Sequence, residues 1–227
     1  FGMNVAMNKG GYESFDTIMK KGLKPLSVEE FEIAAEETGA LILDTRKAAN
    51  FHQGFIPQSI NIGIVGDFAP WVGNMVVDVN QPLLLVTDDG MEEEVITRLS
   101  RVGFDHVLGY IQGGFDAWKA QGKEVDTIKR ISAEEFGSLY KSGDKVIDLR
   151  RASEYEAEHI ENAYNMPLDY INTWINDIDA KEHFYLHCAG GYRSMIAASI
   201  LQARGYRNFT EIEGGFNAIK KIGKIPT

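Results

Sequence analysis

At two places in the chain, a polar residue suited to cap a helix is followed by hydrophobic residues spaced three to four positions apart, a pattern that predicts a helix. One such stretch runs from Ser27-Val-Glu-Glu30 to Thr38, and the other runs from Ser132-Ala-Glu-Glu135 to Tyr140. In both starts the Ser hydroxyl can accept a hydrogen bond from a backbone N–H, and the Glu three residues later can reach back to the N-cap. The pattern therefore predicts two capped helices.

Short apolar runs that end at polar residues predict buried strands. Each run lies next to a stretch with helical periodicity, so strands and helices alternate along the chain. This order is typical of βα units on a largely parallel sheet. The predicted strands are residues 40–44, 82–86, 145–148 and 184–187.

The second half of the chain repeats the pattern of the first. Equivalent positions lie about one hundred residues apart; examples are Ser27 and Ser132, Asp44 and Asp148, and Gly113 and Gly214. So many matches in the same order indicate two homologous α/β domains. We expect them at residues 20–124 and 128–227, with a junction at 127–130.

Residues 1–19 precede both repeats and have no clear periodicity, so we expect a linker there. The chain opens on Phe1, and no charged and then apolar export signal follows it. We therefore expect either a piece of a longer polypeptide, whose missing N-terminal domain precedes this linker, or a remnant of cloning.

The composition is that of a globular protein, with 44% hydrophobic and 25% charged residues. No apolar run reaches the ~18–20 residues that span a bilayer, so we expect no membrane partner. The net charge of −10, without a Lys/Arg-rich stretch, argues against nucleic-acid binding. Cys188 is the one cysteine, which excludes an intrachain disulfide and favours a reducing cytoplasm.

The candidate chemistry lies in the loop after the strand predicted at 184–187, because ligands of open α/β sheets bind beyond the carboxyl ends of the strands. Cys188 lies there, where unpaired N–H groups and the positive end of a helix converge. Gly190 and Gly191 let the loop curl so that its N–H groups point inward, and Arg193 adds positive charge. These features stabilise a thiolate, so we expect a nucleophilic sulfur beside an anion site.

Simpler roles are expected for the neighbours of this loop. We expect Ser194 to be the N-cap of the following helix, Tyr192 to form a loop wall, and His187 to pack at the end of its strand. Asp148 and Arg150 predict a buried ion pair that supports the loop.

A lone cysteine in a cytosolic protein is more often an inert core residue, and the glycines, the arginine and the strand-to-helix position favour the functional interpretation. Glu154 and His159 are expected to organise the connection after their strand. The histidines have no metal-binding spacing, so we expect no metal and no cofactor in this chain. We expect the tryptophans to be core residues; they are Trp71, Trp118 and Trp174.

The second repeat resembles a rhodanese, a sulfurtransferase domain, and so does the first. The resemblance is carried by residues 146–160, 188–193 and 213–216, and in the first repeat by 43–46, 51–57 and 112–118. It implies an α/β fold of two rhodanese-like domains, each a mostly parallel sheet flanked by helices. It implies that Cys188 is catalytic, that Asp148 and Arg150 support the site, and that the substrate is bound by Ala189, Gly190, Gly191, Tyr192, Arg193 and Ser194.

The resemblance also implies a reaction. A Cys188 thiolate would take the sulfane sulfur of thiosulfate or of a low-molecular-weight persulfide, and cyanide, sulfite or a thiol would then remove it, with ping-pong kinetics. We expect these small anionic donors and thiophilic acceptors as partners, and an exposed Arg193 to hold the donor. Assembly into a homo-oligomer stays open.

The first repeat differs at the matching turn, where Asp88 takes the place of Cys188, the arginine is absent and the loop is shorter. Carboxylates crowd this turn, would repel an anionic donor and cannot carry sulfane sulfur. We expect a catalytically inactive first domain, in which Glu92–Glu94 favour a helix N-terminus. Docking, dimerisation or metal binding by these acidic residues is the alternative.

Two other classes of function stay open. His187-Cys188 ahead of Arg193 is similar to the loop of Cys-dependent phosphatases and arsenate reductases, but the four residues between Cys188 and Arg193 are one fewer than in that loop. The second alternative is a non-catalytic module for sulfide sensing or docking.

Asn4 to Phe15 resembles the linker of bacterial fusion proteins in which a metallo-β-lactamase-type persulfide dioxygenase precedes tandem rhodanese domains. This resemblance implies that a non-haem iron belongs to a missing N-terminal domain, and that dioxygenase activity is absent from this chain.

Overall fold

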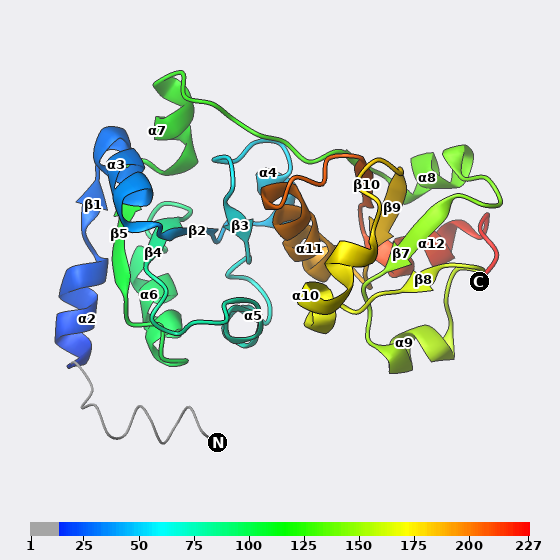
Figure 1. Cartoon of the computed structure of the whole chain (residues 1–227), viewed down its shortest axis with the longest axis horizontal. Helices are drawn as coiled ribbons and strands as arrows, with labels where there is room; N and C mark the ends of the chain where they lie inside the picture. Colours follow the sequence, from blue (N-terminus) through cyan, green and yellow to red (C-terminus); the bar gives the residue numbers. More distant parts are fainter. Residues whose placement is uncertain (1–13) are drawn as a thin grey trace.

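The computed structural model describes residues 14–227, which form two α/β domains placed side by side (Figure 1). Each domain contains a five-stranded parallel sheet. The first sheet has the strand order β1-β5-β4-β2-β3 and the second has the order β6-β10-β9-β7-β8. Numbered within each half, the two orders are identical, which confirms the predicted fold of two homologous domains.

The first domain contains five strands and six helices among the described residues. Its strands are β1 (Pro25–Leu26), β2 (Leu41–Asp44), β3 (Ile60–Asn61), β4 (Leu83–Val86) and β5 (Val107–Ile111). Its helices are α2 (Phe15–Gly22), α3 (Val28–Thr38), α4 (Ala48–Phe51), α5 (Phe68–Met75), α6 (Glu92–Ser100) and α7 (Gly114–Ala120). Helix α2 begins at Phe15, so residues 15–19 of the expected linker are helical; residues 1–13 lie outside the described part.

The second domain repeats this order. Its strands are β6 (Arg130–Ile131), β7 (Lys145–Asp148), β8 (Tyr164–Asn165), β9 (Phe184–His187) and β10 (Phe209–Ile212). Its α-helices are α8 (Ala133–Leu139), α9 (Ala152–Ala157), α10 (Ile171–Trp174), α11 (Tyr192–Ala203) and α12 (Gly215–Ile222), and short 3₁₀ turns flank α10 at Leu168–Tyr170 and Ile175–Asp177.

The predicted caps are present at both helix starts. Ser27 Oγ accepts from the Glu30 N–H at 3.2 Å, and the Glu30 carboxylate accepts from the Ser27 N–H at 2.8 Å, which completes a capping box on α3. Ser132 Oγ accepts from the Glu135 N–H at 3.1 Å and caps α8, but the return bond expected from the Glu135 side chain to the Ser132 N–H is not formed. The two helix predictions are therefore confirmed.

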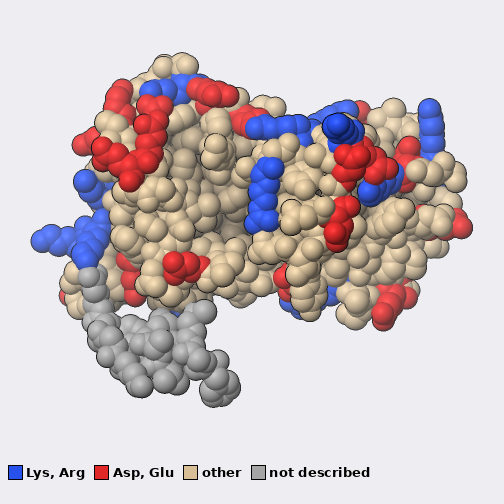
Figure 2. Space-filling model, in the orientation of Figure 1, with Lys and Arg blue, Asp and Glu red and all other residues tan. Residues whose placement is uncertain are grey.

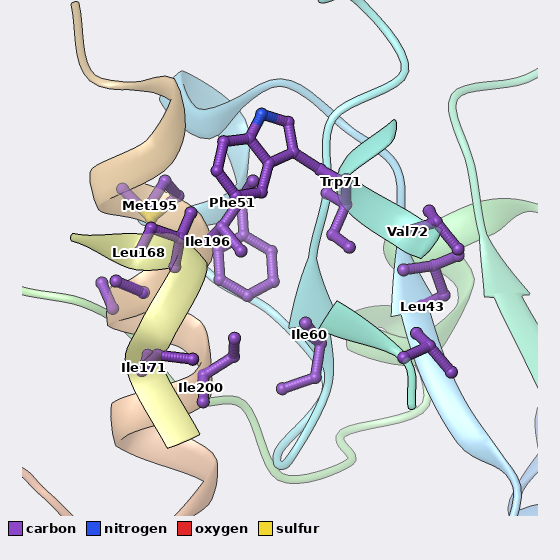
Figure 3. Packing of buried hydrophobic residues seen from close by; sticks show 14 of the residues in the cluster. Leu43, Phe51, Ile60, Trp71, Val72, Leu168, Ile171, Met195, Ile196 and Ile200 are labelled. Atoms are coloured by element: carbon purple, nitrogen blue, oxygen red, sulfur yellow. The ribbon is translucent and has the colours of Figure 1, made fainter. Parts of the chain in front are cut away.

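One hydrophobic core crosses the boundary between the domains. Phe51, Ile60 and Trp71 of the first domain belong to the same buried cluster as Ile196 and Ile200 of α11, and Figure 3 shows these side chains facing one another. Burial of apolar side chains is the main favourable contribution to the packing of the two domains against each other. The domains are therefore joined by a shared core as well as by the chain between them.

Helix α11 is enclosed from all sides. Every residue from Ser194 to Gln202 is buried, because the helix lies between its own sheet and strand β3 of the first domain. Two hydrogen bonds join it to the first domain: the Asn61 N–H donates to Ser199 Oγ at 3.0 Å, and the Tyr192 hydroxyl donates to the Gly63 carbonyl at 2.7 Å. The start of α11, where Cys188 lies, is thereby placed at the domain boundary.

Acidic side chains gather over α3 and α7, at the end of the first domain away from α11 (Figure 2). Within residues 14–227, no helix combines the length and the apolar character needed to cross a bilayer.

Candidate active site

The candidate loop joins β9 to α11. Strand β9 ends at His187, and α11 begins at Tyr192 with Gly191 as its N-cap. Gly191 has a φ of +98°, a conformation that costs residues with a Cβ energy and suits glycine. The prediction that Ser194 is the N-cap is therefore wrong: Ser194 lies inside the first turn of α11 and is buried.

Cys188 lies at the closed end of this loop. Its Sγ accepts the Gly191 N–H at 3.2 Å and lies 3.5 Å from Ser194 Oγ, to which the thiol donates. The side chain is 1% exposed, and it still lines a pocket that opens to solvent. The sulfur is thus held by a backbone donor and remains accessible from one side.

The backbone of the loop is fixed by the start of α12. The Phe216 N–H donates to the Cys188 carbonyl at 2.7 Å, and the Asn217 N–H donates to the Ala189 carbonyl at 3.0 Å. Gly215, with a φ of +55°, makes this approach possible, because a Cβ there would lie 2.2 Å from the Cys188 carbonyl oxygen. This contact explains why the Gly-Gly-Phe sequence belongs to the site.

Arg193 is paired rather than free. Its two terminal nitrogens donate to the two carboxylate oxygens of Glu154 at 2.7 and 2.8 Å. This bidentate hydrogen bonding lowers the pKa of Glu154 to about 2. The Arg193 side chain is 16% exposed, so the expectation of an exposed loop cation is wrong, and its partner Glu154 was not predicted.

The predicted ion pair of Asp148 and Arg150 is present. Arg150 Nη2 lies 2.6 Å from Asp148 Oδ2, and both side chains are buried. The Arg150 guanidinium also lies 3.9 Å from the centre of the Phe216 ring, a cation–π contact. Since the Phe216 N–H holds the Cys188 carbonyl, the pair can support the loop through Phe216.

His187 packs as predicted at the end of its strand. Its ring is fully buried, Nδ1 lies 3.2 Å from the Cys188 carbonyl oxygen, and Nε2 lies 4.0 Å from Asp148 Oδ2. Burial lowers the pKa of His187, which keeps the ring neutral. The ring therefore faces the backbone and not the sulfur.

The pocket above Cys188 has a volume of about 580 Å³ and lies between the two domains. From the second domain it is lined by Cys188, Ala189, Gly190, Tyr192, Arg193, Arg151, Glu154 and Asp169. Gly191 and Ser194, which were also expected to bind substrate, do not line it. The opposite wall comes from the first domain and comprises Val65, Gly66, Asp67, Pro70, Trp71 and Asn74.

This opposite wall was not predicted. Trp71 is buried, as expected for a core residue, but it also faces the pocket. Hydrophobic periodicity gives the elements of each domain and carries no signal for how two domains pack, so residues 65–74 could not be assigned from the sequence.

Two further charged residues lie behind the loop. The Ser194 hydroxyl donates to Glu211 Oε1 at 2.6 Å, and Arg130 Nε donates to Glu211 Oε2 at 2.7 Å. Glu211 is fully buried on β10, and the Arg130 side chain is 7% exposed. The segment Phe209-Thr-Glu-Ile212 has two polar residues among four, so the sequence carries no clear signal that its glutamate is buried.

The residue of the first domain that matches Cys188 is Thr87, not Asp88. Asp44 pairs with Val86 as Asp148 pairs with His187, so the next residues, Thr87 and Cys188, are equivalent. Asp88 is therefore one position further along and is exposed. The prediction of a shorter loop is also wrong.

The length difference lies instead in the helix that follows: α6 has 9 residues and α11 has 12. The Thr87 hydroxyl donates to Glu92 Oε1 at 3.2 Å, and α6 begins at Glu92, as expected for its acidic start. A hydroxyl cannot carry sulfane sulfur as a thiolate does. The first domain is therefore still expected to be inactive, because of Thr87 and not because of Asp88.

A second pocket, of about 600 Å³, lies over Thr87 and is lined by Asp88, Asp89, Glu92 and Asp116 together with Arg46 and Lys119. In residues 14–227 no three or more His, Cys, Asp and Glu side chains come together in a way that could hold a metal ion.

The chain is thus a tandem-domain protein with a single thiol site. It has two homologous parallel α/β domains, and one of them carries a cysteine in the loop between a strand and a helix. The chain belongs to the family of rhodanese-like domains, which matches residues 27–121 and 132–222.

Several relatives match a stretch about as long as one domain. The chain is 35% identical to the uncharacterized protein YqhL of Bacillus subtilis over 98 residues, which are 43% of this chain and 75% of that protein. It is 33% identical to the thiosulfate sulfurtransferase GlpE of Pseudomonas entomophila over 92 residues, which are 40% of this chain and 84% of that protein. A solved rhodanese-like domain protein from Staphylococcus aureus aligns with 40% of this chain and 91% of its own, at 31% identity and a TM-score of 0.38.

Proposed function

We propose that this chain is a sulfurtransferase that carries sulfane sulfur on Cys188. The donor is thiosulfate or a low-molecular-weight persulfide, and the acceptor is cyanide, sulfite or a thiol. The observation that carries the proposal is the position of Cys188 Sγ, which accepts the Gly191 N–H at 3.2 Å and lines the pocket between the domains. The similarity to a protein named thiosulfate sulfurtransferase supports it.

The reaction has two displacement steps. In the first, the Cys188 thiolate attacks the sulfane sulfur of the donor; a new S–S bond forms, and the old one breaks with its electron pair on the leaving sulfite or thiolate. In the second, the acceptor attacks the outer sulfur, and the electron pair of the broken S–S bond returns to Cys188. Donor and acceptor use the same pocket in turn, so ping-pong kinetics follow.

The lining of the pocket supports an organic persulfide as the preferred donor. Arg151 and Arg193 supply positive charge, while Asp67, Glu154 and Asp169 supply negative charge on the same surface. Because Glu154 already pairs with Arg193, a bare dianion such as thiosulfate finds little unpaired positive charge there. A persulfide that carries both carboxylate and ammonium groups finds a complement for each.

The first domain has a role in this proposal that needs no chemistry of its own. Its residues 65–74 build the wall of the pocket opposite Cys188. Contacts from this wall are the means by which the pocket would distinguish one donor from another.

The test is to mix the purified protein with thiosulfate or glutathione persulfide and to measure its intact mass. The expected result is a gain of one sulfur atom that cyanide reverses and that Cys188→Ser abolishes. A Cys188 that gains no sulfur from either donor contradicts the proposal and favours a docking or sensing module.

The pairing of Arg193 argues against the phosphatase alternative. Such an enzyme needs its loop arginine to hold phosphoryl oxygens, and Arg193 is hydrogen-bonded through both terminal nitrogens to Glu154. Turnover of p-nitrophenyl phosphate that depends on Cys188 would reverse this conclusion.

We also propose the wider setting implied by residues 4–15, in which an iron-bearing persulfide dioxygenase domain belongs to the same polypeptide in a cytoplasmic protein. The support for it is the residue similarity, and most of that stretch lies outside the described residues. The present chain should then produce no sulfite from persulfide and oxygen, and sulfite production by this chain alone would contradict the proposal.

A further inference from the structure

A buried carboxylate lies behind the sulfur, and the displacement steps above do not use it. Glu211 is fully buried in the middle of β10, between β6 and β9. An ionised carboxylate in such a place is costly unless charge and hydrogen bonds compensate for it. Arg130 Nε at 2.7 Å from Oε2 supplies the charge, and the Ser194 hydroxyl at 2.6 Å from Oε1 supplies the second hydrogen bond.

Ser194 connects this carboxylate to the nucleophile. A hydroxyl has one proton, and Ser194 donates it to Glu211, so its oxygen faces Cys188 as an acceptor. The Cys188 thiol donates to that oxygen across 3.5 Å. The three groups form one directed path, from thiol to hydroxyl to carboxylate.

The other charged and titratable groups around this path are less suited to take the proton of Cys188. His187 Nδ1 faces the Cys188 carbonyl, and its Nε2 is buried without a hydrogen-bond partner among the described residues, 4.0 Å from Asp148 Oδ2. Burial lowers the pKa of this ring, which makes it a poor proton acceptor. Glu154 is held by Arg193, which lowers its pKa to about 2. The remaining ion pairs near the loop are Asp148 with Arg150, Arg130 with Glu213 and Arg151 with Asp169.

We propose that Glu211 is the proton acceptor of Cys188, through Ser194, and that Arg130 is the positioning residue that keeps Glu211 ionised at rest. The inference rests on the proposed function and adds to it the source of the thiolate.

The proton transfer balances within the site. The Cys188 S–H bond breaks and leaves its electron pair on sulfur; Ser194 Oγ takes that proton while its own passes to Glu211 Oε1. One negative charge moves from carboxylate to sulfur, and the total charge is unchanged. The thiolate then accepts from the Ser194 hydroxyl as well as from the Gly191 N–H. When the acceptor restores the thiolate, the proton returns by the same path.

Burial makes Glu211 suited to this role, because it raises the pKa of the carboxyl and so favours the protonated form. Arg130 opposes this effect and also packs against the loop: a Cβ on Gly191 would lie 3.0 Å from Arg130 Nη2. Two groups that share a proton titrate as a pair, in two macroscopic steps. Cys188 should therefore become reactive in two steps as the pH rises.

The experiment measures the rate at which iodoacetamide alkylates Cys188 across pH, in the wild-type chain and three variants. Glu211→Gln keeps the shape but accepts no proton. Ser194→Ala removes both the relay and the hydroxyl that stabilises the thiolate by a hydrogen bond, so the proton no longer moves from Cys188 to Glu211. It leaves the pair of Glu211 and Arg130 in place. Ser199→Ala is the matched control, because it also removes a buried hydroxyl from α11, one that donates to the Ile196 carbonyl and accepts the Asn61 N–H. It does not touch the path from Cys188 to Glu211.

The wild type and Ser199→Ala should give two steps, and Glu211→Gln and Ser194→Ala should give one. Sulfur transfer by the latter two should fall about a hundredfold at neutral pH and recover at alkaline pH, where no internal acceptor is needed. A one-step wild-type profile, or two steps in Ser194→Ala, overturns the proposal. If Glu211→Gln fails to fold, as circular dichroism would show, Ser194→Ala decides alone.

Failure of this proposal differs from failure of the proposed function. A wild-type chain that gains no sulfur at any pH, by intact mass, refutes the sulfurtransferase assignment. A chain that gains sulfur normally but alkylates in one step refutes the proton path and leaves the assignment in place.

Discussion

Replacing Gly215 by alanine should displace the loop that carries Cys188, although Gly215 does not line the pocket. The new Cβ would lie 2.2 Å from the Cys188 carbonyl oxygen, and the residue would have to keep a φ of +55°. Because the opposing atom belongs to the backbone, the loop and the start of α12 must separate. The hydrogen bonds that the Phe216 and Asn217 N–H groups donate to the loop are then lost.

The expected loss of folding free energy can be estimated from the strained backbone and the lost hydrogen bonds. The left-handed conformation costs a residue with a Cβ about 1–2 kcal/mol, and two lost hydrogen bonds cost about 1 kcal/mol each. For a chain of this size such a loss lowers Tm by about 10 °C. Displacement of the nucleophile by about 1 Å should slow sulfur loading about a hundredfold.

Gly114→Ala is the matched control, because Gly114 occupies the equivalent position in the first domain. Its φ is +61°, and a Cβ there would lie 3.2 Å from the Thr87 carbonyl oxygen, a much milder contact. We expect it to lower Tm by about 4 °C and to leave sulfur loading unchanged. The assays are thermal unfolding and the rate of mass gain with donor. Equal slowing by both variants, or wild-type loading in Gly215→Ala, would refute the argument that α12 fixes the loop.

Three further outcomes can be measured. Glu154→Gln should lower the free energy of unfolding by about 1 kcal/mol near neutral pH. A pKa of about 2 in place of 4.5 gives an upper limit of about 3 kcal/mol. Solvent screening reduces this limit, because the pair with Arg193 is partly exposed. Since the pKa of Glu154 is lowered in the folded state, this stability is present above pH 4.5 and is lost as the pH falls toward 2. The denaturant midpoints of variant and wild type should therefore converge in acid, and a difference that stays constant with pH would contradict the pairing. Tyr192→Phe removes the hydrogen bond to Gly63 and should cost about 1 kcal/mol, measured by urea unfolding, and an unchanged midpoint would show that the bond contributes nothing. Thr87→Cys should place a thiol at the equivalent position of the first domain but gain no sulfur from thiosulfate, because carboxylates line that pocket; a second sulfur in the intact mass would disprove this electrostatic argument.

The sequence was sufficient for features that depend on neighbouring residues. Ser27 and Glu30 lie three positions apart and form the predicted capping box, since both partners belong to one helical turn. The strands at 145–148 and 184–187 have the predicted bounds, because a parallel strand buried on both faces needs a short apolar run. Cys188 was identifiable because glycines and an arginine follow it directly.

Features that join distant residues were not predictable in the same way. Glu154 and Arg193 are 39 positions apart, and no local pattern indicates that their side chains meet. The misplacement of Asp88 has a similar origin. The first repeat is shorter in its helix and not in its loop, and the strand register, which the sequence does not give, identifies Thr87 as the equivalent residue. Ser194 looked like a cap because serine favours that position, but Gly191 takes the left-handed turn and starts the helix earlier.

The enclosure of α11 gives the first domain a structural role that does not depend on a cysteine of its own. A helix that is buried on every side along nine consecutive residues has no surface of its own to offer to water. Excised from its companion, the thiol-bearing half would expose an apolar flank large enough to cause aggregation. We therefore expect the packing surface of the first domain to matter to the second domain whatever chemistry the first domain has.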